Sequence, residues 1–291
     1  MLRYLVIMLD ASAPSFCYYP DPPKGDSQKM SVDTLRQAVY FAQTHALSVN
    51  VLAGEMPGEE IRRELDKINH IFIGPDAATN DFVWDITVLG PDDDFAAIRP
   101  NPDKNIILRI PLARMEEIPG IVSALSGKFL RLNIILEDSW QMTPELAPAY
   151  RKVLDSVPAL PEGVQLDILT DRPALAGPRH CGAGDVHLTV APDGKLYICP
   201  GFFFDDPSRS CGDVFFGPDI PLPELFKLEK APICRECDAW QCKRCVWMNH
   251  RRTREVNTPS RGQCITAHVE RNKALPDNPS VYLDPFEIIG R

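Results

Sequence analysis

The sequence predicts an α/β domain followed by a small cysteine-rich domain, on two observations. Residues 1–175 alternate between short apolar runs rich in Val, Ile and Leu and longer amphipathic segments. Apolar runs of this length separated by helical patterns are typical of strands joined by helices. Eight of the nine cysteines lie between Cys181 and Cys264. The last third of the chain therefore has a chemistry of its own.

Six apolar runs in the first domain are predicted strands, because each is short and closed by Gly, Pro, Asp or Glu, as buried parallel strands are. A further short strand is left open at Asp81–Leu89. The six predicted strands are Arg3–Leu9, Ser48–Ala53, His70–Gly74, Asn105–Ile110, Arg131–Leu136 and Val164–Leu169.

The segments between these runs have helical periodicity, and Ser31 is placed to cap the first of them. Six strands with intervening helices predict an α/β layout, either doubly wound or a partial barrel. The predicted helices are Ser31–Ala46, Glu59–Lys67, Met115–Leu125 and Pro144–Val157.

A break in regular structure is expected at Asp171–Arg179, which contains two prolines and a glycine. We therefore predict domains at residues 1–175 and 176–291. Beyond the break, Val186–Val190 and Lys195–Ile198 flank an Ala-Pro-Asp-Gly turn, which predicts a hairpin. Two helices are expected after it, at Gln241–Arg254 and Cys264–Lys273, and the first would carry Cys242 and Cys245 on one side.

Composition excludes two classes of partner. The formal charge is −9 and the isoelectric point is near 5.2, which argues against a general nucleic-acid binder that must neutralise phosphates. No apolar run is long enough to span a bilayer. The apolar stretch after Met1 is too short for a signal peptide and is interrupted by Asp10. We predict a cytoplasmic protein, in which thiols stay reduced.

The cysteines predict metal binding. Paired Cys-x-x-Cys steps let two sulfurs converge on one soft metal, and eight thiols are enough for two four-ligand sites. A disulfide framework is the alternative, but it belongs mainly to short secreted chains. The spacing leaves iron–sulfur clusters and zinc ions both open. The eight candidate ligands are Cys181, Cys199, Cys211, Cys234, Cys237, Cys242, Cys245 and Cys264.

The remaining candidate functional residues have weaker support from the sequence. His180 and His250 lie near cysteines in sequence and are candidates to replace one of them, whereas His187 is expected to be a packed strand residue. Cys17 stands apart and is assigned no role. Glu137-Asp138 follows a predicted strand, and we assign it no chemistry. Residues 231–273 carry nine basic and four acidic side chains, which suits a solvated face, the charge balance of anionic clusters or an acidic partner.

The cysteine pattern resembles the SPASM domain, the auxiliary iron–sulfur module of many radical SAM peptide-modifying enzymes. The resemblance covers about residues 178–275 and includes Gly194 between the first two cysteines. The gaps of four and two residues that follow Cys237 and Cys242 are each one shorter than in the family, and Cys211 is an additional thiol. The resemblance implies two [4Fe–4S] clusters. One would be held by Cys181, Cys199, Cys211 and Cys245, and the other by Cys234, Cys237, Cys242 and Cys264.

The preceding residues are similar to the partial (β/α)6 barrel that carries the radical SAM site. Cys17-Tyr18-Tyr19 follows the first strand as the last cysteine of the family's triad does, and Ala53-Gly54-Glu55-Met56-Pro57 is similar to its cofactor-binding stretch. The positions of the other two cluster cysteines are Asp10 and Pro14. One thiolate cannot replace three. The resemblance therefore implies a degenerate barrel, for which S-adenosylmethionine is not expected as a cofactor.

Residues 237–247 and 255–260 further resemble the CXXX repeat peptide maturases. This resemblance implies an iron–sulfur accessory protein in the maturation of a Cys-rich, ribosomally made peptide. Its partners would be the precursor peptide and a radical SAM enzyme of the same system, to which it would present substrate or relay electrons. The alternative function is a zinc-stapled peptide- or protein-binding module without a redox role, in which two zinc ions replace the clusters.

Overall fold

The computed structural model describes residues 2–22, 28–75, 82–101 and 103–275. The chain divides into two compact units that are interleaved along the sequence. Unit 1 comprises residues 1–88 and 182–227, and unit 2 comprises residues 89–181 and 228–291. These units are defined by contacts and do not test the domain boundary near residue 176, which stays a prediction.

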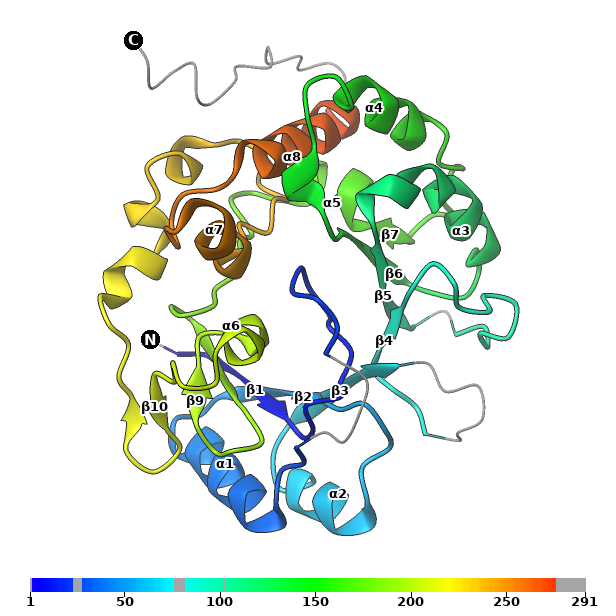
Figure 1. Cartoon of the computed structure of the whole chain (residues 1–291). Coiled ribbons are helices and arrows are strands. Elements are labelled where there is room, and N and C mark those ends of the chain that lie inside the picture. Colours follow the sequence, from blue (N-terminus) through cyan, green and yellow to red (C-terminus); the bar gives the residue numbers. More distant parts are fainter. Residues whose placement is uncertain (1, 23–27, 76–81, 102, 276–291) are drawn as a thin grey trace. The chain divides into compact units, whose positions relative to one another are not determined.

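Unit 1 contains four parallel strands in chain order, β1 (Tyr4–Met8), β2 (Ser48–Leu52), β3 (His70–Pro75) and β4 (Ile86–Leu89), the last of which ends at the unit's boundary. The first three confirm predicted strands. β4 forms within the segment left open at Asp81–Leu89, of which residue 81 lies outside the described residues. Helices α1 (Val32–Thr44) and α2 (Glu59–Leu65) connect these strands and lie side by side on one face of the sheet (Figure 1). Ser31 caps α1 as expected, since its hydroxyl accepts the Thr34 N–H.

The predicted hairpin forms from β8 (His187–Val190) and β9 (Leu196–Tyr197), which are antiparallel. Gly194 has a φ of +79° in the turn, a conformation that a residue with a Cβ rarely adopts. β8 also pairs with β1 in parallel, so the strand order in this unit is β4-β3-β2-β1-β8-β9. The hairpin thus extends the sheet of the first strands.

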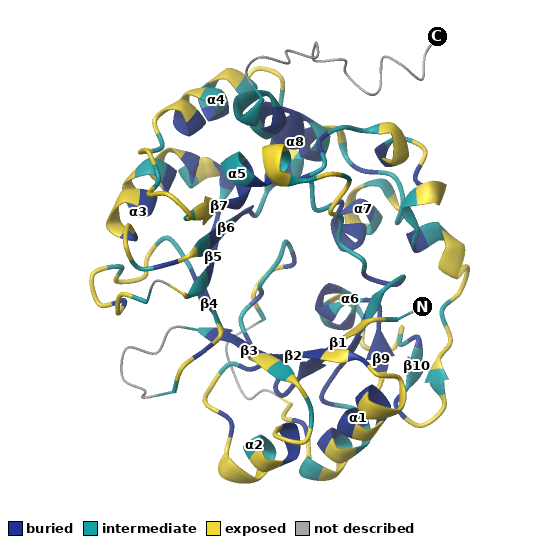
Figure 2. Cartoon of the chain, turned by 180° about the vertical axis from the view of Figure 1, so that it is seen from behind, coloured by how far each residue is buried: buried dark blue, intermediate teal, exposed yellow. Residues whose placement is uncertain are grey.

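The opposite face of this sheet is covered by α6 (Pro200–Asp205) and by the chain that follows β1 (Figure 1). The Phe204 ring of α6 stacks on Tyr19 at a centroid distance of 5.8 Å. Because both faces are covered, β1 is buried along nearly its whole length, as parallel strands are (Figure 2). A two-stranded ribbon, β10 (Gly212–Asp213) and β11 (Gly217–Pro218), and the 3-10 helix η3 (Pro223–Phe226) complete the unit.

Unit 2 begins with parallel strands β5 (Asn105–Ile110), β6 (Arg131–Leu136) and β7 (Gln165–Leu166). The helix expected at Met115–Leu125 is divided into a 3-10 segment, η1 (Leu112–Glu117), and α3 (Ile118–Ala124). The helix expected at Pro144–Val157 is α4 (Ala147–Asp155), which follows the 3-10 helix η2 (Ser139–Gln141).

One predicted strand of this unit is wrong in its second half. The strand expected at Val164–Leu169 ends at Leu166, and α5 (Asp167–Ala174) begins directly after it. The reason is Asp167, whose buried carboxylate accepts the Ile134 and Ile168 N–H groups, both at 2.9 Å. These bonds turn the chain into a helix, which continues through Pro173 inside the expected break.

The end of unit 2 contains 3-10 helices η4 (Leu228–Lys230) and η5 (Cys234–Glu236) and helices α7 (Val246–Thr253) and α8 (Arg261–Ala274). α8 confirms a predicted helix and packs against α4, α5 and η2. The helix expected at Gln241–Arg254 starts only at Val246, because Arg244 has a φ of 45° and interrupts it. Cys242 and Cys245 therefore do not share a helix face. No helix in the described ranges is long and apolar enough to cross a membrane.

Close packing of α8 on η2 yields a stability prediction. A Cβ at Gly262 would overlap the backbone carbonyl of Trp140, which cannot move out of its way as a flexible side chain would. Gly262→Ala should therefore lower the free energy of unfolding by about 1–3 kcal/mol, measured by urea denaturation. Gly120→Ala is the matched control, because a Cβ there meets open space within α3. It should be neutral or stabilising by about 0.5–1 kcal/mol. Equal effects of the two changes would contradict the packing.

Candidate metal centre

The predicted ligands are divided between the two units. Unit 1 contains Cys199 and Cys211, and unit 2 contains the other six. The ligand set Cys234, Cys237, Cys242 and Cys264 thus lies within one unit, whereas the set with Cys181 and Cys245 draws on both. Both assignments stay predictions.

Cys181 is held beside the C-terminal cysteines by the backbone. Its N–H donates to the Lys243 carbonyl at 2.6 Å, and the Arg179 N–H donates to the Trp240 carbonyl at 2.9 Å. Between them, His180 Nδ1 lies 2.9 Å from the Cys242 carbonyl. Three successive residues therefore run alongside residues 240–243, and these contacts join Cys181 to residues 234–245, here called the cysteine loop.

Two thiols receive backbone N–H groups. The Arg244 N–H points at Cys242 Sγ at 3.5 Å, a geometry that the left-handed φ of Arg244 makes possible. The Met248 N–H points at Cys245 Sγ, also at 3.5 Å, so Cys245 is the N-cap of α7. The N-terminus of a helix and inward-pointing N–H groups both favour a negatively charged sulfur. Both contacts favour the thiolate, the form that binds metal.

Burial acts against that charge. It raises the pKa of Cys234 to about 11 and that of Cys242 to about 12, and it also raises the pKa of Cys237. The neighbouring thiolates Cys234 and Cys237 raise the pKa of Cys242 further, so the three sulfurs interact, while Arg244 counteracts the rise at Cys234. A metal cation would reverse this balance, because it binds the thiolates and releases their protons.

The donor types fit a metal centre of this kind. Among the described residues, no three His, Cys, Asp or Glu side chains are already gathered around one point at ligand distances. Two are close, since Cys237 Sγ lies 3.4 Å from Nε2 of His268 on α8. The sequence interpretation did not name His268 as a candidate ligand. Its position one helical turn after Cys264 could have indicated it.

The histidines named from the sequence have different surroundings. His187 lies in β8, and burial lowers its pKa to about 4, which agrees with a packed strand residue. Burial also lowers the pKa of His180. His250 lies near the end of α7. Whether His180 or His250 replaces a cysteine stays untested.

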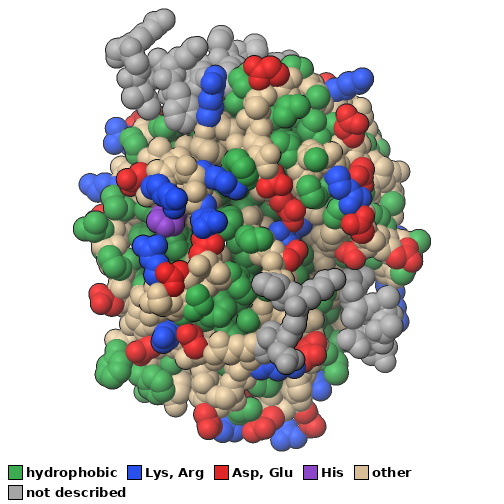
Figure 3. Space-filling view, viewed as in Figure 1, with side chains coloured by type: hydrophobic (Ala, Val, Ile, Leu, Met, Phe, Trp, Pro, Cys, Tyr) green, Lys and Arg blue, Asp and Glu red, His purple; other side chains and the backbone are tan. Residues whose placement is uncertain are grey.

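Lys243 and Arg244 of the cysteine loop differ from the basic residues of α7 in their exposure. Lys243 pairs with Asp167 at 3.1 Å, and Arg244 is only 2% exposed. Arg251, Arg252 and Arg254 are exposed, and Arg252 lies 3.2 Å above the Trp140 ring. Figure 3 shows basic side chains gathered in the region where Figure 1 has α7. Of these five basic side chains, the exposed ones belong to α7 and its C-cap.

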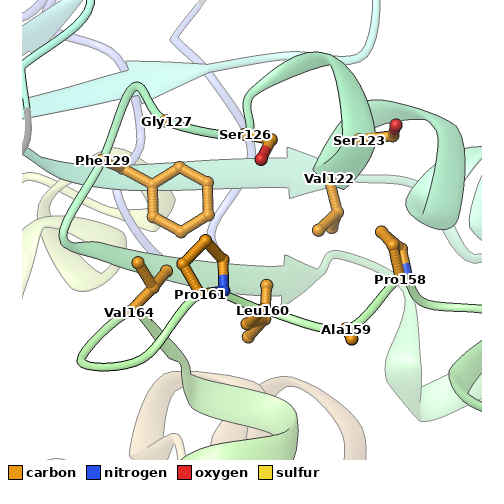
Figure 4. A pocket seen from close by; sticks show the side chains of 10 residues that line it. All are labelled: Val122, Ser123, Ser126, Gly127, Phe129, Pro158, Ala159, Leu160, Pro161 and Val164. Atoms are coloured by element: carbon orange, nitrogen blue, oxygen red, sulfur yellow. The ribbon is translucent and has the colours of Figure 1, made fainter.

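Two acidic groups of unit 2 form structural contacts. Glu137 pairs with the buried Arg109 at 2.6 Å. Glu270, which the sequence did not single out, accepts the Tyr150 hydroxyl at 2.9 Å, and burial raises its pKa to about 8. A cavity of about 60 Å³ between α3 and residues 158–164 contains no titratable side chain and offers no acid or base (Figure 4).

The chain after β1 is organised around Asp10, which is 4% exposed. Its carboxylate accepts the Ser12 N–H at 3.0 Å and the Ser12 hydroxyl at 2.6 Å. It also accepts the Gly54 N–H at 2.9 Å, from the loop after β2. A Cβ at Gly54 would come within 2.9 Å of Asp10 Oδ1, so the close approach requires glycine. Asp10 is a structural link between two loops.

Of the remaining matches to a radical SAM site, Glu55 is engaged through its side chain and Cys17 through its backbone. Glu55 forms an ion pair with Lys29. The Cys17 N–H donates to the Ser15 hydroxyl at 3.3 Å. One thiol and one engaged carboxylate do not make a three-thiolate site for an iron–sulfur cluster. The residues present therefore do not fit the group that such a fold would place here.

Structural comparisons identify the fold. The whole chain aligns with native anSMEcpe with bound AdoMet and the Cp18Cys peptide, at 14% sequence identity, a TM-score of 0.56 and 99% coverage of that chain. SuiB of Streptococcus suis bound to precursor peptide SuiA aligns with 91% of this chain and 76% of its own, at 13% identity and a TM-score of 0.53. No family model matches the sequence. No curated protein matches it either.

This likeness concerns the fold. It confirms the α/β class and the radical SAM-like partial barrel predicted from the sequence. The SPASM-like character of the cysteine-rich segment stays a prediction.

The Asp10 link can be tested by a nearly isosteric change. Asp10→Asn replaces one carboxylate oxygen with an NH2 group that must face N–H or O–H donors. We expect the free energy of unfolding to fall by about 1.5–3 kcal/mol in urea denaturation, since hydrogen bonds to a charged acceptor are lost. Ser12→Ala, which removes one of the three donors, should cost only about 0.5–1.5 kcal/mol. An Asp10→Asn protein as stable as the original would refute the structural role.

Proposed function

We propose that this chain is an accessory protein in the maturation of a Cys-rich, ribosomally made peptide. It binds the precursor peptide, carries metal at its C-terminal cysteines and works beside a radical SAM enzyme. It does not itself cleave S-adenosylmethionine. The observation that carries this proposal is Asp10, a carboxylate with hydrogen bonds to Ser12 and Gly54, where a cluster-binding thiolate is needed.

Peptide binding is supported by the kind of protein that shares the fold. Both solved structures described above were obtained with a peptide bound, in one case a precursor peptide. A barrel that has lost its own cluster keeps its surface, and its surface is what a substrate contacts. The exposed arginines of α7 suit an acidic partner.

Metal binding is supported by the cysteines themselves. Three of the thiols interact with one another, and two receive backbone N–H groups, which are features of sulfur ligands. The resemblance of the sequence implies two [4Fe–4S] clusters, and two zinc ions are the alternative. In either case the metal, when bound, holds the loops that carry its ligands together.

The first test concerns S-adenosylmethionine. The anaerobically purified protein, mixed with S-adenosylmethionine and dithionite, should form no 5′-deoxyadenosine above a protein-free control, measured by liquid chromatography. The reason is that the cofactor must chelate an iron that only a three-cysteine site leaves open. Asp10→Cys with Pro14→Cys should stay inactive, because the Ser12 and Gly54 contacts of this loop are built for a carboxylate. Product that scales with the amount of wild-type protein would refute the proposal.

The second test concerns the arginines of α7. Arg251→Glu with Arg252→Glu should weaken binding of a labelled acidic precursor peptide by about tenfold or more at low salt, measured by fluorescence anisotropy. Binding to the wild type should itself weaken as salt rises. Arg99→Glu with Lys152→Glu is the matched control, since it changes the net charge equally at exposed sites outside α7. If both double variants lose affinity equally, the arginines of α7 contribute only net charge.

A further inference from the structure

The distance between Cys237 Sγ and His268 Nε2 is close to that between two ligands of one metal ion. In a tetrahedral site, a sulfur lies about 2.3 Å and a nitrogen about 2.0–2.1 Å from zinc. At a tetrahedral angle these bond lengths place sulfur and nitrogen about 3.6 Å from each other. The observed Sγ–Nε2 distance is 3.4 Å. Two ligands of one ion would need to move very little.

A [4Fe–4S] cluster does not fit this pair equally well. Each iron of such a cluster takes one protein ligand, and four cysteines hold its four corners. Ligands of different irons are therefore spread around the cluster. The pair at 3.4 Å forms a hydrogen bond in this structure, and the same separation suits two ligands of one metal ion.

We propose that Cys234, Cys237, Cys242 and His268 bind a single zinc ion, with His268 in the place that the family pattern gives to Cys264. Three cysteines and one histidine are an established structural zinc donor set, and Cys234-x-x-Cys237 has the spacing of its usual chelating pair. The inference rests on the metal-binding role proposed above and specifies the metal for one of its two centres.

The surroundings support this donor set. The three thiols belong to one unit and interact electrostatically. The Arg244 N–H points at Cys242 Sγ. Zinc with three thiolates and a neutral imidazole carries a net charge of −1, and the buried guanidinium of Arg244 acts on Cys234 with the opposite sign. Buried charge is thus compensated.

α8 explains how a histidine can replace the expected cysteine. Cys264 and His268 are four residues apart in one helix and lie on the same face, one turn apart. Gln241 Nε2 donates to the Ala267 carbonyl at 2.7 Å, next to His268, and fixes the cysteine loop against this part of the helix. The loop that carries Cys237 and Cys242 therefore meets α8 at the turn of His268.

The experiment uses the full-length protein purified without oxygen or added metal. Zinc, iron and sulfide are quantified, and X-ray absorption at the zinc edge gives the ligands. We expect one zinc per chain, with three sulfurs and one nitrogen. His268→Ala should reduce zinc affinity by more than about 100-fold in competition with a chelator, since loss of even an outer-shell partner costs 10–100-fold. His268→Cys should restore binding with four sulfurs, and Cys264→Ala should change the affinity by less than about threefold.

Each alternative result has a clear meaning. Iron and sulfide without zinc would overturn this inference and leave the proposed metal-binding function standing. Protein without any metal would overturn both, and the Cys237–His268 contact would then be a hydrogen bond. Zinc that is lost with Cys264→Ala and kept with His268→Ala would restore the four-cysteine set. If His268→Ala does not fold, the zinc-edge spectrum of the wild type still decides between three and four sulfurs.

Discussion

The cysteine loop is anchored by Asp238, whose carboxylate pairs with Arg271 of α8. Its carbonyl accepts the Arg172 guanidinium of α5 at 2.5 Å, and the same guanidinium lies 4.0 Å from the centroid of the Trp240 ring. These contacts bind residues 238–240 to two helices that also pack on each other. The position of Cys237 and Cys242 relative to α8 depends on this anchor.

A second constraint shapes the other unit. The Asp10 carboxylate accepts hydrogen bonds from Ser12 and Gly54, and Glu55 forms an ion pair with Lys29. Both side chains thereby join loops of unit 1. A buried carboxylate is stabilised when it accepts several N–H and O–H groups, and Asp10 accepts three. The loops after β1 and β2 are thus held together by hydrogen bonds of their own.

Much of the fold could be predicted because strands such as Asn105–Ile110 are apolar throughout and closed by polar residues. The errors have local causes. Asp167 begins a helix because its carboxylate reaches back to Ile134, a contact 33 residues away in sequence. Arg244 interrupts the helix expected at Gln241–Arg254 because it has a left-handed φ, a conformation that an arginine side chain does not favour. His268 could have been noticed from its spacing to Cys264, but its approach to Cys237 depends on how α8 packs.

The pairing of β1 with β8 constrains the order in which the chain can acquire its structure. Tyr4 lies opposite His187, so one edge of the first strand has no partner until most of the chain has been synthesised. Contacts so distant in sequence slow folding, because the chain loses the entropy of closing a long loop before the stabilising contact forms. Unit 2 is in the same position, since α8 completes a core begun by β5. Neither unit can finish before the other has started, and the newly made chain must keep an apolar strand edge from wrong partners during that interval.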